Sequence, residues 1–220
     1  MNCSCCGPED INDLDNTFTR KRAQKDARRY LKKGLAKRSQ KLVAHVEGRL
    51  PPDATMLEIG CGAGGLHHEL LRRNVVREAV GVDASSAYLA AARENAAKLG
   101  LSDAVTYHQR DFAQFAHEFM PAELVVMDRV ICCYPHLEQL LGQAAQHTTR
   151  FLAISFPPHK WWMRWGFKVV DTVLTLTGSQ YHPYLHSLHD ITAVAKKAGL
   201  KPVHRDHHNF LWRIMVFERI

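Results

Sequence analysis

The sequence lacks any run of about 18 uncharged apolar residues, so we expect no membrane-spanning helix. Its first ten residues lack a basic stretch followed by an apolar core, and we therefore expect no secretory signal. The phosphate-loop ending Gly-Lys-Ser/Thr is also missing, which disfavours a nucleotide site of that type. With 46% hydrophobic and 23% charged residues, the 220-residue chain has an ordinary globular composition, and its length favours one domain with an appendage.

Cysteines are few and clustered. The six fall into three groups, which are Cys3 with Cys5 and Cys6, Cys61 alone, and Cys132 with Cys133. This spacing does not resemble a disulfide framework, so we expect reduced thiols and a cytoplasmic location. The first group can bind a soft metal in principle, but no second Cys/His pair at zinc spacing accompanies it. We therefore predict no metal site.

Positive charge is concentrated near the N-terminus. The chain carries a net charge of +7, and residues 20–41 alone hold eleven Lys or Arg against a single acid. Apolar periodicity predicts helices over residues 19–33 and 35–50. A solvated helix face explains such a run, and attraction to a nucleic acid or an anionic membrane is the alternative. The helix pair can also fold over a ligand site, which would place Tyr30 near it.

Residues 56–65 are the most informative stretch. They predict a short buried strand that contains Glu58, then a loop with Gly60, Gly62 and Gly64 at alternate positions, then a helix. Glycine allows a tight turn and lets a ligand approach the backbone amides. The helix N-terminus adds a partial positive charge. The spacing departs from the G-x-G-x-x-G pattern of dinucleotide folds.

Three later apolar runs end near an acid, which is Asp83, Asp111 and Asp128 in turn. A carboxylate at the tip of the second strand suits two ribose hydroxyls, and Asp83 can equally cap the following helix. Asp111 can accept a hydrogen bond from an adenine amino group, while Phe112 offers its backbone N–H or its ring face. Because ligands bind at the carboxyl ends of parallel strands, we expect these side chains to share one site.

Together these motifs, over residues 56–157, resemble the class I S-adenosylmethionine-dependent methyltransferases. The resemblance implies an α/β fold, with a Rossmann-like doubly wound sheet of seven strands, mostly parallel, that ends in an antiparallel hairpin and follows N-terminal helices. It implies S-adenosylmethionine as the cofactor, with Glu58 facing its amino-acid end. The residues expected to bind it are Glu58, Gly60, Cys61, Gly62, Gly64, Asp83, Ala84, Asp111, Phe112, Asp128 and Arg129. Residues 128–135 also look like small bacterial methyltransferases that are likened to magnesium-protoporphyrin O-methyltransferase.

We expect residues 1–50 to form an arm and basic helices that cap the cofactor site, and residues 51–220 to form the methyltransferase domain. An aromatic insertion is expected at about 159–186, where Trp161, Trp162 and Trp165 stand beside basic residues. Such a helix can cover a hydrophobic substrate or lie on a membrane surface. Packing against the sheet is the alternative.

The predicted activity is methyl transfer to a small-molecule acceptor, apolar, with an oxygen, sulfur or carboxylate nucleophile. Tyr134, His136 and His186 are candidates for deprotonating or orienting it. One alternative is an RNA methyltransferase that uses residues 20–41, although the Asn/Asp-Pro-Pro-aromatic turn of base-amino methyltransferases is missing after Asp128. A thiol-dependent arsenite methyltransferase and a non-enzymatic cofactor-binding protein are two others. The sequence predicts no oligomeric state.

Overall fold

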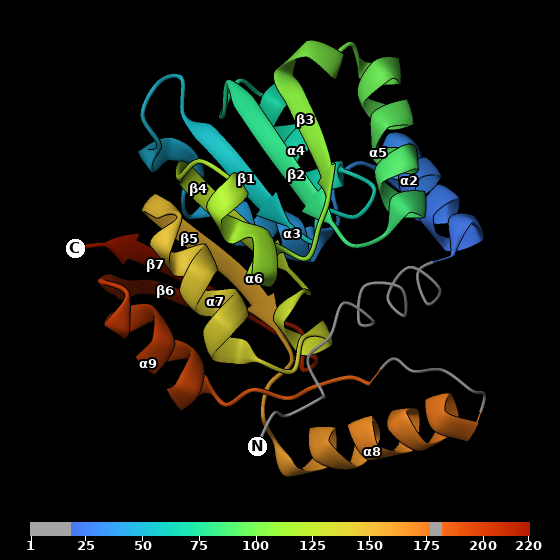
Figure 1. The fold of residues 1–220 in the computed structure, drawn as a ribbon, viewed down its shortest axis with the longest axis vertical. Helices are drawn as coiled ribbons and strands as arrows, with labels where there is room; N and C mark the ends of the chain where they lie inside the picture. Colours follow the sequence, from blue (N-terminus) through green and yellow to red (C-terminus); the bar gives the residue numbers. More distant parts are fainter. Residues whose placement is uncertain (1–18, 177–181) are drawn as a thin grey trace.

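The computed structural model describes residues 19–176 and 182–220. These residues form one seven-stranded sheet with helices around it (Figure 1). The strand order is β3-β2-β1-β4-β5-β7-β6; β1 to β5 run parallel, and β7 is antiparallel to β5 and β6. The predicted sheet, with its antiparallel C-terminal hairpin, is confirmed. The strands are β1 (Thr55–Ile59), β2 (Glu78–Asp83), β3 (Val105–Gln109), β4 (Ala122–Asp128), β5 (Thr148–Phe156), β6 (Leu200–His208) and β7 (Trp212–Arg219).

Helices cover both faces of this sheet (Figure 1). On one face lie α3 (Lys37–Ala44), α4 (Gly65–Arg72) and α5 (Ser86–Leu99), and on the other lie α6 (Phe112–Phe115), α7 (Leu137–Gln146) and α9 (Leu188–Lys197). Strand β4 shows why its sequence is continuously apolar. Leu124 and Val126 pack in the core under α3, α4 and α5, whereas Val125 and Met127 pack in the core under α6, α7 and α9. All four side chains are fully buried. A parallel strand covered on both faces requires this pattern.

The first described helix, α2 (Arg20–Lys33), packs on α5 beside the glycine loop. Ala23 and Ala27 meet Ala63 and Tyr88 in a small separate core. The Tyr88 hydroxyl also donates to Asp26 Oδ2 at 2.7 Å. The N-terminal segment is therefore attached over the carboxyl end of the sheet, where the turns after β1 and β2 lie.

Two predicted elements differ from the structure. The second basic helix ends at Ala44 and is followed only by a 3-10 turn, Glu47–Arg49. Pro51 disfavours a helical residue before it, and Leu50 is accordingly extended. The sequence also predicts a last strand over residues 210–219, but this strand begins at Trp212. Asn209 adopts a left-handed φ of 59° and accepts a hydrogen bond from the Leu211 amide, so residues 209–211 form the turn.

Candidate active site at the carboxyl ends of the strands

The glycine loop turns sharply between β1 and α4. Gly60, Gly62 and Gly64 have φ values of 65°, 54° and 80°, a region that other residues rarely adopt. The amides of Gly60 and Cys61 both donate to the Val82 carbonyl, at 2.7 and 3.1 Å. These bonds hold the loop against the end of β2. The alternate glycines predicted from the sequence are therefore required by the backbone.

Asp83, the last residue of β2, organises the same loop. Its Oδ2 accepts from the Gly62 amide at 2.8 Å, and its Oδ1 accepts from the Ser85 amide at 2.8 Å. Ser85, rather than Asp83, is the N-cap of α5. The neighbouring Ala84 carbonyl accepts from the Gln109 side chain at 3.2 Å. Asp83 thus links the end of β2 to the glycine loop that follows β1.

Glu58 belongs to a buried polar network. Its Oε2 lies 2.6 Å from His67 Nδ1 and also accepts from the His67 amide. The Tyr107 hydroxyl lies 3.0 Å from His67 Nε2 and 2.6 Å from His68 Nε2. Burial raises the pKa of Glu58 well above its usual value and lowers the pKa of His67 to about 3. Both imidazoles are therefore neutral at neutral pH.

We expect His68 to make the protein sensitive to acid. Burial, and then the nearby His67, lower the pKa of His68 to about 2. Between that value and the unfolded pKa near 6.5, only the unfolded chain binds the proton. The contribution of His68 to the free energy of unfolding is therefore fully present above pH 6.5 and falls by about 1.4 kcal/mol for each pH unit below it.

Urea denaturation of His68→Gln between pH 7.5 and 5 measures this contribution. The variant should lose stability less steeply with falling pH than the unchanged protein, because glutamine does not titrate. His189→Gln is the matched control, since the His189 side chain is 90% exposed. Equal slopes in the His68 variant and the unchanged protein would contradict the assignment.

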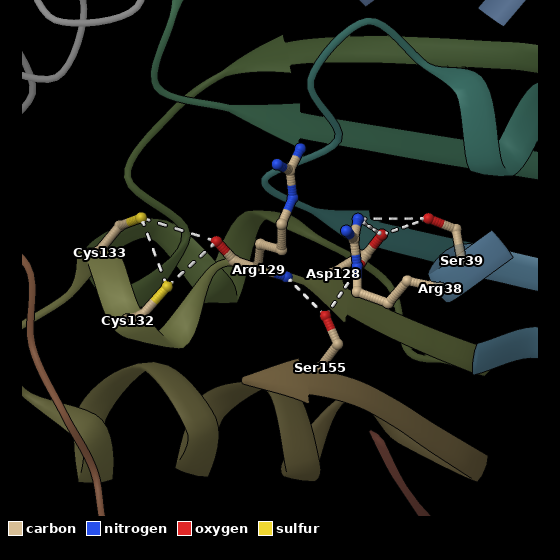
Figure 2. A network of polar contacts seen from close by, with 7 residues as sticks. All are labelled: Arg38, Ser39, Asp128, Arg129, Cys132, Cys133 and Ser155. Atoms are coloured by element: carbon tan, nitrogen blue, oxygen red, sulfur yellow. Dashed lines mark hydrogen bonds and ion pairs between the residues drawn. The ribbon is translucent and has the colours of Figure 1, made fainter. Parts of the chain in front are cut away.

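Asp128, at the end of β4, is held by the N-terminal segment (Figure 2). Arg38 donates to both of its oxygens at 2.8 Å, and Ser39 donates to Oδ2 at 2.6 Å. Ser155 on β5 donates to Oδ1. Burial raises the pKa of this carboxyl, but the bonds from Arg38, Ser155 and Ser39 outweigh burial and lower it. Asp128 is therefore ionised and pairs with a cation that lies 90 residues away in the sequence.

Arg129 follows Asp128 with a left-handed φ of 67°, although it is not glycine. Its amide donates to Ser155 Oγ at 3.0 Å, and its side chain extends away from Asp128 (Figure 2). Arg129 borders a cavity between the N-terminal helices and the strand ends. The described residues around this cavity include Asp26, Tyr30, Arg38, Ser39, Glu58, Gly60, Cys61, Gly62, Ala63, Tyr88, Asp128 and Arg129.

The predicted adenine contacts lie outside this cavity. Asp111 is the N-cap of α6, where it accepts from the Ala113 amide at 2.9 Å. The Phe112 ring packs in the core against Phe119. The predicted catalytic residues are nevertheless beside Asp111, because Tyr134 donates its hydroxyl to Asp111 Oδ2 at 3.1 Å.

His136 and His186 accompany Tyr134. The Tyr134 and His136 rings are 6.4 Å apart, and His186 Nε2 lies 2.9 Å from the Tyr134 carbonyl oxygen. The structure therefore brings all three candidates together, although none of them borders the cavity among the described residues. The contact to a carbonyl requires a proton on His186 Nε2, which leaves Nδ1 as an acceptor.

The described cysteines do not form a site of three thiols. Cys132 Sγ and Cys133 Sγ are 4.0 Å apart, and both lie within reach of the Arg129 carbonyl (Figure 2). Burial raises the pKa of Cys61, and Cys133 together with burial raises that of Cys132. In residues 19–176 and 182–220, no three His, Cys, Asp or Glu side chains are placed to hold a metal. Cys3, Cys5 and Cys6 lie outside these ranges.

Several residues of the site have roles that the sequence pattern does not predict. Arg38 and Ser39 stand in a basic run that was interpreted as a solvated face, and only long-range packing shows that they meet Asp128. The sequence pattern likewise predicts no role for His67 or Tyr107. The His67–His68 doublet directly after the glycine loop was the available signal, because adjacent histidines at a buried helix start need partners.

Comparison with known proteins links part of the chain to methyltransferases. A family model described as a methyltransferase domain matches residues 50–157. The matched residues, which make up just under half of the chain, are similar to this family of enzymes. The match covers β1 to β5, which includes the glycine loop and every strand-end acid described above.

Solved structures of methyltransferases share the fold. Magnesium protoporphyrin IX methyltransferase from Synechocystis PCC 6803, crystallised with bound SAH, has a TM-score of 0.70 and is 20% identical; the match covers 96% of this chain and all of that one. An O-methyltransferase family protein from Burkholderia thailandensis also scores 0.70 at 18% identity, covering 94% and 61% of the two chains.

Curated relatives match over shorter stretches. The trans-aconitate 2-methyltransferase of Variovorax paradoxus is 32% identical over 126 residues, which cover 56% of this chain and 45% of that protein. A 23S rRNA (uracil(1939)-C(5))-methyltransferase of Stenotrophomonas maltophilia is 42% identical over 71 residues, covering 31% and 16%. The chain therefore spans less than half the length of these relatives.

Proposed function

We propose that this protein transfers the methyl group of S-adenosylmethionine to a small-molecule acceptor. The glycine loop carries the proposal, because two of its left-handed residues, Gly60 and Gly62, border a cavity that is also lined by Asp26, Glu58 and Asp128. The family match and the likeness to a structure with bound SAH support the same cofactor. Trans-aconitate and magnesium protoporphyrin, named for similar proteins, support a small acceptor.

The residues at the strand ends fit this cofactor. A carboxylate has about four lone-pair sites, so the bonds of Asp83 to Gly62 and Ser85 are compatible with accepting from ribose hydroxyls. The ionised Asp128 supplies negative charge beside the cavity, which suits an ammonium group or a sulfonium, and Glu58 borders the same cavity. The sulfonium carbon is already electrophilic, so the protein mainly has to align donor and acceptor.

We infer that Tyr134, His136 and His186 act on the acceptor. With Nε2–H directed at the Tyr134 carbonyl, His186 presents Nδ1 as the proton acceptor. The bond from Tyr134 to Asp111 orients the phenol. Residues 1–50 are proposed to cap the cofactor site, and residues 51–220 to form the domain proper, with the aromatic insertion at about 159–186.

Asp83→Ala should lower cofactor affinity by roughly 10- to 100-fold, because each hydrogen bond to a charged group contributes about 1.5–3 kcal/mol. Isothermal titration calorimetry with S-adenosylhomocysteine measures the change. Asp103→Ala is the control, since Asp103 is an exposed acid in a turn before β3. A folded Asp83→Ala variant that binds with unchanged affinity would remove the basis of the proposed site.

RNA is the second candidate acceptor, favoured by the 71-residue likeness to an rRNA methyltransferase and by the basic helices. The structure reduces the charge available for it. Arg38 is committed to Asp128, and Lys41 pairs with Asp206 at 2.9 Å. If RNA is the acceptor, its affinity must fall steeply with salt, because neutralised phosphates release counterions. Absence of RNA binding at low salt would exclude it.

A further inference from the structure

Helix α8 (Trp161–Leu176) carries an apolar face that is largely exposed. It lies apart from the layers around the sheet, at one end of the molecule (Figure 1). Of its sixteen residues only Met163 is buried. Residues four apart share one side of a helix, and the exposed fractions along that side are Trp161 74%, Trp165 65%, Val169 61% and Val173 54%, with Leu176 at 81%.

The turn between β6 and β7 extends this apolar surface. The Phe210 ring lies 5.8 Å from the Trp162 ring, and Phe210 is 72% exposed. Leu211 beside it is 39% exposed. An exposed apolar surface that continues across two elements, with two tryptophans on it, marks an interaction site rather than scattered surface residues.

Basic side chains flank this surface on one side. Lys160, Arg164 and Lys168 recur every four residues, adjacent to the apolar row, and all three are exposed. Lys168 Nζ lies 5.6 Å from the Trp165 ring. The single acid of the helix, Asp171, bonds His182 at 2.6 Å. The helix therefore presents tryptophan and aliphatic side chains next to a cationic row.

We propose that α8 and the turn at residues 209–211 dock on the surface of a bilayer that contains anionic phospholipid. Tryptophan favours the lipid–water interface, and basic residues beside it pair with anionic headgroups. None of the described helices has the length and apolarity to cross a bilayer. In the proposed contact, the exposed apolar row of α8 lies along the interface plane. A two-fold dimer in which α8 packs antiparallel to its copy would bring the two cationic rows together, which disfavours that arrangement.

Vesicle co-sedimentation of the full chain tests the proposal. The protein should sediment with phosphatidylcholine vesicles that contain phosphatidylglycerol, and its tryptophan emission should shift to the blue. Replacing Lys160, Arg164 and Lys168 by glutamine should weaken the partition coefficient roughly 100-fold. Trp161→Ser with Trp165→Ser should weaken it by at least about tenfold and remove most of the emission shift.

Matched controls lie elsewhere on the surface. Lys196, Lys197 and Lys201 are exposed and basic, so their replacement by glutamine removes the same charge outside α8. Met120→Ser removes a side chain that is 84% exposed and lies before β4. Both controls should bind vesicles like the unchanged protein.

Three results would overturn the proposal. The first is the absence of sedimentation with the vesicles that contain phosphatidylglycerol. The second is equal weakening by the control and the α8 substitutions. The third is a dimer in light scattering that the two tryptophan substitutions dissociate, because a second copy would then cover the face. None of these results bears on methyl transfer, since the proposal does not rest on the cofactor site.

Discussion

Replacing Arg38 by alanine is expected to destabilise the protein by about 3–5 kcal/mol, because it leaves the buried Asp128 carboxylate without its cation. The guanidinium donates to both carboxylate oxygens, and both side chains are nearly buried, with exposed fractions of 13% and 11%. The same pair anchors α3 at the end of β4, so the loss should also loosen the N-terminal helices over the cavity. Urea denaturation at pH 7.5 measures the change.

The chain contains a matched control on the same helix. Lys41 pairs with Asp206 at 2.9 Å, which is close to the 2.8 Å between Arg38 and Asp128. The Lys41 and Asp206 side chains, however, are 48% and 37% exposed. Lys41→Ala should therefore change the free energy of unfolding by less than about 1 kcal/mol. The double variant Arg38→Ala with Asp128→Asn should be more stable than Arg38→Ala alone, since it no longer buries a charge. Equal effects of the two single variants would show that burial does not strengthen the Arg38 pair.

Replacing Gly60 by alanine should damage both the stability of the protein and its glycine loop. A Cβ at Gly60 would lie 2.5 Å from Val130 Cγ2, and the residue has a φ of 65°. The left-handed backbone costs a side chain about 1–2 kcal/mol, and overpacking against a stiff valine adds about 1–3 kcal/mol. The free energy of unfolding should fall by about 2–5 kcal/mol, and binding of S-adenosylhomocysteine should weaken because the loop must move.

Gly100→Ala separates these two effects. Gly100 has a φ of 69°, close to that of Gly60, but no atom lies within 4 Å of a Cβ placed there. Its substitution should therefore show the backbone cost alone and leave cofactor affinity unchanged. In Gly60→Ala, adding Val130→Ala should recover part of the lost binding by removing the clash. If Gly100→Ala and Gly60→Ala weaken the protein and its binding equally, the close approach of Val130 to Gly60 does not matter.

The sequence was sufficient for the sheet and for its ligand-facing end. A parallel strand buried on both faces must be apolar along most of its length, so β1, β2 and β4 are visible as apolar runs with an acid at or next to the last residue. The left-handed φ values of Gly60, Gly62 and Gly64 explain why glycine recurs there. The boundaries of the second helix were predicted less well, because Leu42 and Leu50 share a helical spacing that Pro51 interrupts.

Only the tertiary structure decided which side chains share the site. Arg38 meets Asp128 across 90 residues, and Tyr107 meets His67 across 40, and no local spacing encodes such contacts. It also showed that the rings of Trp161 and Trp165 face outward instead of packing on the sheet. Local periodicity specifies an element and its apolar face, whereas the partner of that face depends on how distant elements pack.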